Sequence, residues 1–417
     1  MTQGSLHVIG AGLAGLAAAM RASTHDWRIF VHEGANQAGG RCRSYYDRDL
    51  GCRIDNGNHL MLSANRAALG YMHEIGSLGT ILRADEPRIP FVDRLSGERW
   101  AVWPNRGRMP WWVLAPARRV PGTNPVDYLA PLKLAGLDAT ATVAQGFDTD
   151  SLLYRRLWEP FAVAALNTRP EEASARVLWN VIQESFAQGG DALFPIVPRE
   201  GLSESLIDPA LATLSMRGAT IRFNARLREL RTDGARITEL LFTDGSVTLE
   251  PEDRVILAVP AQVASDLGLE IRAPQSFRAI VNGHFKLEHA IDPPGILGMI
   301  GGMAEWIFVK PEVISTTTSA AEHIVDWGAE EIAQSLWADV QAALGLQGLA
   351  MPQWRIVKEK RATFAATPVE ECRRPGPLTR WRNLLLAGDW TATGLPSTIE
   401  GAIRSGQRAA AALACMS

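Results

Sequence analysis

Residues 6–33 read LHVIGAGLAGLAAAMRASTHDWRIFVHE and decide the fold. Leu6–Ile9 is a short apolar run, typical of a buried parallel strand. The Ala- and Leu-rich stretch Leu13–Ala22 has the composition of a helix. A second strand is expected at Arg28–His32 and ends at Glu33. The order of strand, glycine-rich turn, helix and strand predicts a dinucleotide-binding βαβ unit.

Each glycine of this turn has a physical task. Gly10 permits the tight turn, and Gly12 has no side chain to keep a pyrophosphate away from the backbone. Gly15 lets the helix pack closely on the strand. The helix begins at Leu13 and Ala14, where free N–H groups and the positive end of the helix dipole favour phosphate. We therefore expect these five residues to form the cofactor-binding turn.

The acid that ends the second strand indicates which nucleotide binds. Glu33 lies 21 residues after Gly12, where a carboxylate accepts hydrogen bonds from a ribose hydroxyl and disfavours a 2′-phosphate. FAD and NAD both satisfy this pattern. The sequence Gly39-Gly40-Arg41 follows and is expected to bring a guanidinium to the same pyrophosphate.

Three further segments make the chain resemble the flavin-dependent amine oxidase and phytoene desaturase superfamily. They are IDNGNHL (54–60), ATIRFNARLREL (219–230) and RVILAVPAQVASDL (254–267). The resemblance implies FAD as the cofactor and a backbone contact to its adenine near Leu227. It also implies that the turn Asn56, Gly57, Asn58 and His59 faces the flavin.

The segment LAGDWTATGLPSTIEGAIRSG (386–406) is expected to complete the flavin site. Gly388 and Asp389 follow an apolar strand, and ligands of open α/β sheets bind at the carboxyl ends of strands. In the superfamily, Asp389 would bind a ribityl hydroxyl. Thr398, Ile399 and Glu400 would start the last helix beside the isoalloxazine, with Glu400 near the ribityl chain or the pyrophosphate.

The resemblance implies an α/β fold with two interleaved domains. A discontinuous, Rossmann-like FAD-binding domain would take residues 1–80, 195–265 and 375–417. An α+β substrate-binding domain would take residues 81–194 and 266–374.

A closer resemblance is to the squalene-associated FAD-dependent desaturases, also called hydroxysqualene dehydroxylases. It covers nearly the whole chain and includes DNGNHLMLSANRAAL, LWEPFAVAALNTRPEEASARVLWNVIQES, IVNGHF and EKRATFAATP. The implied reaction is reductive removal of the allylic hydroxyl of hydroxysqualene, a C30 isoprenoid, to give squalene for hopanoid synthesis. No second G-x-G-x-x-G is present for a nicotinamide reductant, so the source of electrons stays open.

Other functions fit the same fold. The first alternative is a carotenoid-type polyprenoid desaturase or oxidase, which would use oxidised FAD. An amine oxidase is disfavoured because such sites need an aromatic cage and the chain has only 5 Tyr. A lipid-binding chaperone without flavin is disfavoured because Glu33, Arg41 and Asp389 are all present.

The reaction needs a proton donor for the departing hydroxyl, and the sequence leaves its identity open. An ordinary histidine titrates near neutral pH, and His59 lies on the turn that faces the flavin in relatives. Asp55 lies on the same turn, and Arg361 precedes the return to the FAD-binding domain. These three residues are the catalytic candidates.

Composition excludes several classes of function. The net charge of −3 gives no signature of nucleic-acid binding. The four Cys have no zinc-like spacing and indicate a reducing compartment, so no metal is expected. No apolar stretch reaches transmembrane length. A cytoplasmic protein is expected.

One segment suggests contact with a membrane surface. Residues 99–126 hold four Trp, five Arg and no Asp or Glu. Aromatic and basic residues together suit an interface with anionic headgroups, although a tunnel wall with a basic rim has the same composition. The segment predicts peripheral binding to the cytoplasmic membrane face, beside an entrance for the lipid substrate.

Overall fold

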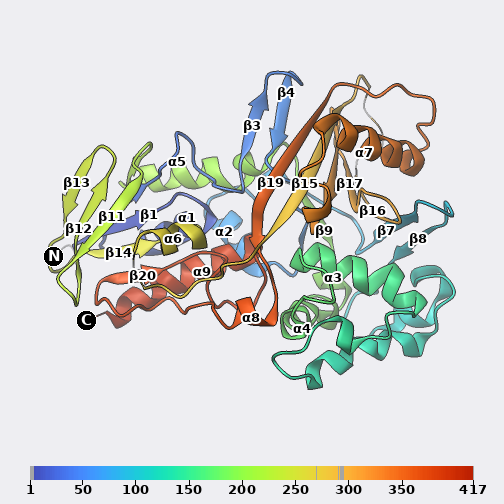
Figure 1. The fold of residues 1–417 in the computed structure, drawn as a ribbon, viewed down its shortest axis with the longest axis horizontal. Helices are drawn as coiled ribbons and strands as arrows, with labels where there is room; N and C mark the ends of the chain where they lie inside the picture. Colours follow the sequence, from blue (N-terminus) through green and yellow to red (C-terminus); the bar gives the residue numbers. More distant parts are fainter. Residues whose placement is uncertain (1–3, 269, 290, 292–294, 417) are drawn as a thin grey trace.

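A five-stranded parallel sheet forms the centre of the computed structural model, which describes residues 4–268, 270–289, 291 and 295–416 (Figure 1). Because all neighbours are parallel, the carboxyl ends of the strands meet at one edge. The strands, in spatial order, are β10 (Thr220–Arg222), β2 (Arg28–His32), β1 (Ser5–Ile9), β14 (Arg254–Leu257) and β20 (Leu384–Leu386).

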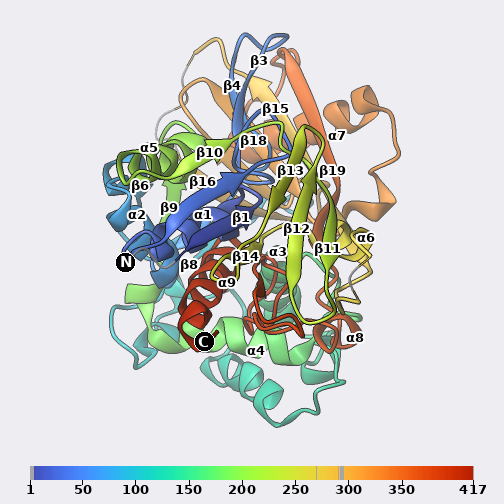
Figure 2. The same ribbon diagram turned by 90° about the vertical axis from the view of Figure 1, so that its left-hand side faces the viewer.

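Alternating side chains of the central sheet bury its two faces in different cores. Val8 and Ile256 pack among four helices, while Val255 and Leu257 pack against a second, antiparallel sheet. The helices are α1 (Leu13–Ala22), α2 (Arg66–Glu74), α5 (Asp208–Met216) and α9 (Ile399–Ala412); the second sheet is β11 (Leu227–Thr232), β12 (Ile237–Phe242) and β13 (Gly245–Thr248). Figure 2 shows these three layers edge-on.

The first and last helices lie in direct contact. A Cβ built on Gly406 of α9 would lie 2.0 Å from the carbonyl oxygen of Ala14 in α1. The contact therefore needs glycine at this point, and it brings the two ends of the chain side by side (Figure 1).

A seven-stranded sheet forms the second large unit, with α7 (Ala329–Leu344) on one face. Its strands, in spatial order, are β19 (Trp354–Phe364), β15 (Phe277–Lys286), β18 (Val313–Thr318), β17 (Trp306–Val309), β16 (Gly295–Ile300), β7 (Ile89–Asp93) and β8 (Arg99–Val102). The α/β class expected from the sequence is confirmed. The domain bounds stay a prediction, although each large sheet draws its strands from the segments assigned to one domain.

Short helices follow β8 and form the lower right of Figure 1. They include η2 (Trp111–Leu114), η3 (Pro116–Arg118), η4 (Pro125–Gly136), α3 (Glu159–Leu166) and α4 (Ala175–Glu184). The smaller elements are the hairpin β3 (Ser44–Asp47) and β4 (Cys52–Asp55), the sheet β5 (Met61–Leu62), β9 (Pro195–Pro198) and β6 (Ile81–Arg83), and the helices α6 (Ala261–Asp266) and α8 (Pro368–Glu371).

Two buried histidines lie side by side in the central sheet. His7 Nδ1 and His32 Nε2 are 3.1 Å apart, and the rings stack on Phe30 and Phe242. Loss of hydration lowers the pKa of His7 to about 4 and that of His32 to about 3. Near pH 5 the unfolded chain protonates both residues while the folded protein leaves them neutral. The contribution of the two neutral histidines to the free energy of unfolding is therefore complete above about pH 6.5, and it is lost as the pH decreases below that value.

Replacing His32 with Gln removes one of these titrating groups. We expect the fall in melting temperature between about pH 7.5 and about pH 5 to be smaller by about 2–4 °C, which corresponds to about 2 kcal/mol. Differential scanning fluorimetry at the two pH values measures it. The exposed His25 supplies the control, because His25→Gln should keep the wild-type pH dependence. The same pH dependence in His32→Gln would contradict the assignment.

Candidate flavin site

The glycine-rich turn forms an open cradle at the carboxyl end of β1. Gly10 has φ of 103°, and a Cβ there would lie 2.5 Å from the carbonyl oxygen of Ala258. A Cβ on Gly15 would lie 1.9 Å from the carbonyl oxygen of Gly10. Gly12, in contrast, has no atom within 4 Å of its Cβ position. Protein atoms thus fill the space beside Gly10 and Gly15. The space beside Gly12, where the pyrophosphate is expected, is free.

The start of α1 has donors to offer a ligand. Its N-cap residue is Gly12, which has no side chain to cap the first N–H groups, and the first turn holds no acid. Gly12 also forms a bridge with Gly39, and a Cβ on Gly40 would lie 3.7 Å from the Cα of Gly12. The glycine-rich turn and the Gly39-Gly40 pair, which are far apart in the sequence, therefore meet at Gly12, directly before the first residues of α1, Leu13 and Ala14. This arrangement fits a pyrophosphate.

Glu33 connects this cradle to neighbouring segments of the same chain. Its carboxylate accepts hydrogen bonds from Ala11 N at 2.8 Å and Ala35 N at 2.9 Å. Its carbonyl oxygen accepts one from Ala225 N at 2.8 Å, which brings β11 and its first residue, Leu227, close by. Each carboxylate oxygen retains a lone pair for a ribose hydroxyl, so the contacts of Glu33 and Leu227 with the adenosine part of FAD remain predictions.

An ion pair joins the two halves of the site. Arg41 Nη2 lies 2.7 Å from Asp389 Oδ1, and Arg41 Nη1 donates to the carbonyl oxygen of Ala362 at 2.7 Å. Ser397 Oγ donates to the other carboxylate oxygen of Asp389. Burial alone would raise the pKa of Asp389, but Arg41 and these hydrogen bonds outweigh it and lower the pKa. Three segments that are far apart in the sequence thus meet at one ion pair: Arg41, Ala362, and the loop that holds both Asp389 and Ser397.

The exposure of this pair differs between its partners. The Arg41 side chain is 39% exposed, whereas that of Asp389 is 8% exposed. The guanidinium therefore keeps a free surface for an anionic ligand. We expect Asp389 to act chiefly by orienting Arg41, and its contact with a ribityl hydroxyl remains a prediction.

Asp55 is held as a buried anion. Its carboxylate accepts hydrogen bonds from Lys310 Nζ at 2.8 Å, Ser44 Oγ at 2.7 Å and Leu202 N at 2.9 Å. Burial would raise its pKa, but Lys310 and the hydrogen bonds lower it. A carboxylate so stabilised is a poor proton donor. We therefore assign Asp55 a bracing role in the turn that follows β4.

The rest of this turn faces a partly accessible space. Asn58 Nδ2 donates to Thr317 Oγ1 at 3.1 Å and to the carbonyl oxygen of Thr316 at 3.2 Å, which ties the turn to the seven-stranded sheet. Asn56, Gly57 and His59 are all half-buried. The turn is therefore held against β18 of the seven-stranded sheet.

His59 is the catalytic candidate that fits this space best. Burial lowers the pKa of His59. The charge of Asp55 opposes this effect, whereas the charges of Arg41 and Lys310 lower the pKa further. Among the residues that the structure describes, no hydrogen bond to the His59 ring is present. Its imidazole is therefore neutral near pH 7 and free to contact a substrate.

Arg361 lies elsewhere. Its side chain is exposed, and its guanidinium carbon is 5.9 Å from the centre of the Phe277 ring. The backbone of the next residue, Ala362, is what reaches Arg41. The structure does not bring the Arg361 side chain into the cluster around Asp389.

The start of α9 makes one contact that the sequence did not predict. Thr398 is its N-cap, and its hydroxyl accepts a hydrogen bond from Gly401 N at 3.0 Å. Ile399 is buried. Glu400, however, accepts hydrogen bonds from the first N–H groups of α2, those of Ala67 and Ala68, at 3.0 and 2.8 Å. Its carboxylate also binds Arg404 Nε at 2.9 Å. We therefore assign Glu400 to capping α2, where an anion offsets the helix dipole, instead of to the flavin.

Arg374, a fully buried cation near the site, was not among the residues predicted from the sequence. Its side chain has no exposed surface. The guanidinium donates to the carbonyl oxygens of Asp389 at 3.1 Å and Thr391 at 3.0 Å, to Thr393 Oγ1 at 3.0 Å and to Glu371 Oε1 at 2.7 Å. Arg374 thus holds the loop after β20, whose carboxylate binds Arg41. Only its nearness in the sequence to the C-terminal motif could have indicated this role.

Replacing Arg374 with Lys keeps the charge but removes the planar set of donors that holds two backbone and two side-chain oxygens. We expect FAD to bind about 10- to 100-fold more weakly, as measured by fluorescence titration of the apoprotein. The matched control is Arg373→Lys, since Arg373 is one-third exposed and pairs with Glu370. A lower melting temperature with unchanged FAD affinity would show that Arg374 serves the fold alone.

Comparison with known proteins identifies the family. The model of flavin containing amine oxidoreductases matches residues 13–414. The chain belongs to this family. The hydroxysqualene dehydroxylases of Sinorhizobium fredii and Rhodopseudomonas palustris are 44% and 43% identical to it, and each alignment covers 97% of both proteins. The resemblance to that group is confirmed, as are the FAD cofactor and the oxidoreductase class.

Solved structures agree on the fold. An oxidoreductase from Methanosarcina mazei superposes with a TM-score of 0.73 at 15% identity, over 96% of this chain and 98% of that one. A putrescine oxidase variant superposes with a TM-score of 0.72 at 16% identity, over 99% of both chains. The cradle at Gly12 and the free face of Arg41 fit FAD in this fold.

Proposed function

We propose that this protein removes the allylic hydroxyl of hydroxysqualene by reduction and releases squalene. The observation that carries the proposal is the sequence identity of 42–44%, over 97% of this chain, to three hydroxysqualene dehydroxylases. The zeta-carotene desaturase of Synechocystis sp. is only 23% identical over 97% of this chain. The desaturase alternative therefore has weaker support.

The reaction breaks one C–O bond and forms one C–H bond. The hydroxyl takes up a proton and leaves as water, and the allylic carbon receives a hydride. FAD, when bound and reduced, supplies that hydride. The protein must hold the carbon chain in place, deliver the proton and keep out other water.

We assign the contact with the hydroxyl to His59. Asp55 is unsuitable because it is a stabilised anion, and Arg361 lies outside the cluster. The lowered pKa of His59 makes its protonated form scarce near pH 7 but a strong acid when present. Proton delivery through His59 should therefore become faster as the pH falls.

Anaerobic mixing of the reduced holoenzyme with hydroxysqualene tests both assignments. We expect squalene to form and the flavin to be oxidised in a single turnover, at a rate that rises as the pH is lowered. His59→Gln should slow this step about 100-fold or more and abolish its pH dependence, while Arg361→Gln serves as a control that keeps the wild-type rate.

Other outcomes separate the alternatives. Bleaching of oxidised flavin by a more saturated polyprene, without reaction of hydroxysqualene, would support a desaturase and overturn the proposal. An unchanged rate in His59→Gln would remove His59 as the proton donor while leaving the overall reaction intact.

We also propose that the substrate is taken from a membrane surface, which the short helices η2–η4 would contact. The structure corrects the predicted segment in part: Trp100 and Trp112 are buried, at 7% exposure each, so they serve the core. Trp111 is 62% exposed. The residues that form the docking face are Met109, Trp111, Leu114, Val126, Leu129 and Leu132, all more than half exposed.

The docking face supports peripheral contact only. In the part of the chain that the structure describes, no helix has the length and apolarity needed to cross a bilayer. Exposed apolar side chains on neighbouring helices bury into the interface instead, and basic residues beside them add attraction to anionic lipid.

Vesicle flotation of the variant Trp111→Ser/Leu114→Ser tests the docking face. We expect at least about a tenfold weaker partition onto phosphatidylcholine vesicles, because two apolar side chains lose their burial in the interface. The control is Met216→Ser/Val369→Ser, which removes two exposed apolar side chains elsewhere. Equal flotation of the two double variants would refute the docking face.

A further inference from the structure

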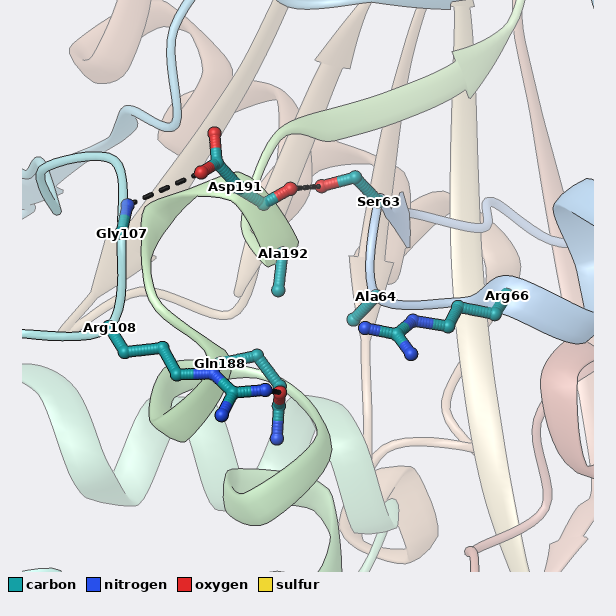
Figure 3. Close-up of a pocket in the computed structure, with 8 residues that line it drawn as sticks. All are labelled: Ser63, Ala64, Arg66, Gly107, Arg108, Gln188, Asp191 and Ala192. Atoms are coloured by element: carbon teal, nitrogen blue, oxygen red, sulfur yellow. Dashed lines mark hydrogen bonds between the residues drawn. The ribbon is translucent and has the colours of Figure 1, made fainter.

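A polar cavity lies beside the segment that leads into the docking face, and none of its lining residues belongs to the glycine cradle or to the Arg41–Asp389 pair. Its volume is about 310 Å³, and three segments of the chain form it (Figure 3). The residues around it are Ser63, Ala64, Arg66, Gly107, Arg108, Gln188, Asp191 and Ala192. The side chains of Arg66 and Arg108 enter the hollow from opposite sides, as Figure 3 shows.

These two arginines have no carboxylate partner. Within the described residues, neither Arg66 nor Arg108 takes part in an ion pair. Arg108 Nη2 donates instead to Gln188 Oε1 at 3.1 Å, a neutral acceptor. The guanidiniums therefore keep most of their donors free toward the cavity.

Two further arginines, Arg83 and Arg106, lie near the cavity but outside its lining. The guanidinium carbons of Arg83 and Arg106 lie 4.2 and 5.4 Å from the centre of one ring, that of Phe194. Asp191 is the single carboxylate that lines the cavity; it accepts a hydrogen bond from Gly107 N at 3.3 Å and lies 3.9 Å from Arg106 Nε. The cluster thus carries several guanidiniums and one carboxylate, and their mutual repulsion decreases when an anion binds among them.

The position of the cavity points to the source of that anion. Arg108, which lines the cavity, is directly followed by Met109, and Trp111 lies two residues after Met109, so the cavity borders the docking face. When apolar side chains enter a bilayer, the groups at their rim reach the depth of the lipid phosphates. Arginine pairs with phosphate through two parallel hydrogen bonds.

We propose that this cavity binds the phosphate group of an anionic lipid, with Arg66 and Arg108 as its direct ligands. The proposal rests on the docking face described above and adds selectivity to it. The apolar residues give attraction to any bilayer, and the cavity makes the protein prefer an anionic one. Lipid binding there would also set the orientation in which the protein lies on the surface.

The experiment compares full-length holoenzyme on phosphatidylcholine vesicles with and without phosphatidylglycerol, at constant ionic strength. We expect the wild-type preference for anionic vesicles to fall about 30-fold in Arg66→Gln/Arg108→Gln, since each cation near an anionic surface contributes about a factor of five. Arg21→Gln/Arg48→Gln is the control: it removes the same charge from exposed positions away from the docking face and should keep the preference.

A charge-conserving variant separates a built site from general surface charge. Arg66→Lys/Arg108→Lys should lose a large part of the preference, because lysine cannot make the paired hydrogen bonds. Wild-type preference in this variant would overturn the site, as would equal behaviour of Arg66→Gln/Arg108→Gln and its control.

The remaining outcomes distinguish this proposal from the docking face. Binding of wild type to neutral vesicles, with no effect of any arginine variant on anionic ones, would retain the docking face and reject the site. Binding to neither vesicle would reject both. Stabilisation of the protein by inorganic phosphate alone, without competition between phosphate and vesicles, would assign the cavity to a soluble anion and reject a lipid.

Discussion

The ion pair between Arg41 and Asp389 is the interaction on which the rest of the flavin site depends. The two residues are separated by 348 positions in the sequence, and the 2.7 Å contact joins the loops after the second and the last strand of the central sheet. A charge pair with one partner largely desolvated is favourable only when its geometry is kept. Neighbouring groups supply that constraint, because Ser397 binds the carboxylate and Ala362 binds the guanidinium.

Several buried charges around this pair have the same purpose, which is to fix backbone in place. Asp55 fixes the turn after β4, Glu400 caps α2, and Arg374 holds the carbonyl groups of the last loop. Each is satisfied by several partners, as a buried charge must be. The imidazole of His59, in contrast, has no hydrogen-bond partner among the residues that the structure describes. The strong interactions of the site thus fix the backbone, whereas the side chain of His59 stays free to take part in the reaction.

The sequence predicted the parts of this site that depend on local pattern. The turn from Gly10 to Gly15 and the acid at Glu33 follow from spacing alone, since one strand and one helix fix them. The family resemblance supplied the C-terminal half. What it could not supply were side-chain partners across distant segments: that Glu400 turns to α2, or that Arg374 turns to the last loop, depends on tertiary contacts.

The same limit applies to the surface. Composition indicated the aromatic and basic character of residues 99–126, but it could not separate Trp111, which is exposed, from Trp112, which packs against Tyr128. Adjacent residues on a short helix point in different directions, and only the packing of the helix decides which of them meets solvent.

The close contact of Gly406 with Ala14 has a consequence for biosynthesis. The apolar face of α1 is covered by α9, and the strand β20 completes the sheet beside β14. A nascent chain that has emerged only as far as β14 therefore exposes an unpaired strand edge and an uncovered helix. Such surfaces attract chaperones and other nascent chains. The nucleotide-binding half therefore cannot complete its fold until β20 and α9 have been synthesised, although its glycine-rich turn is made long before them.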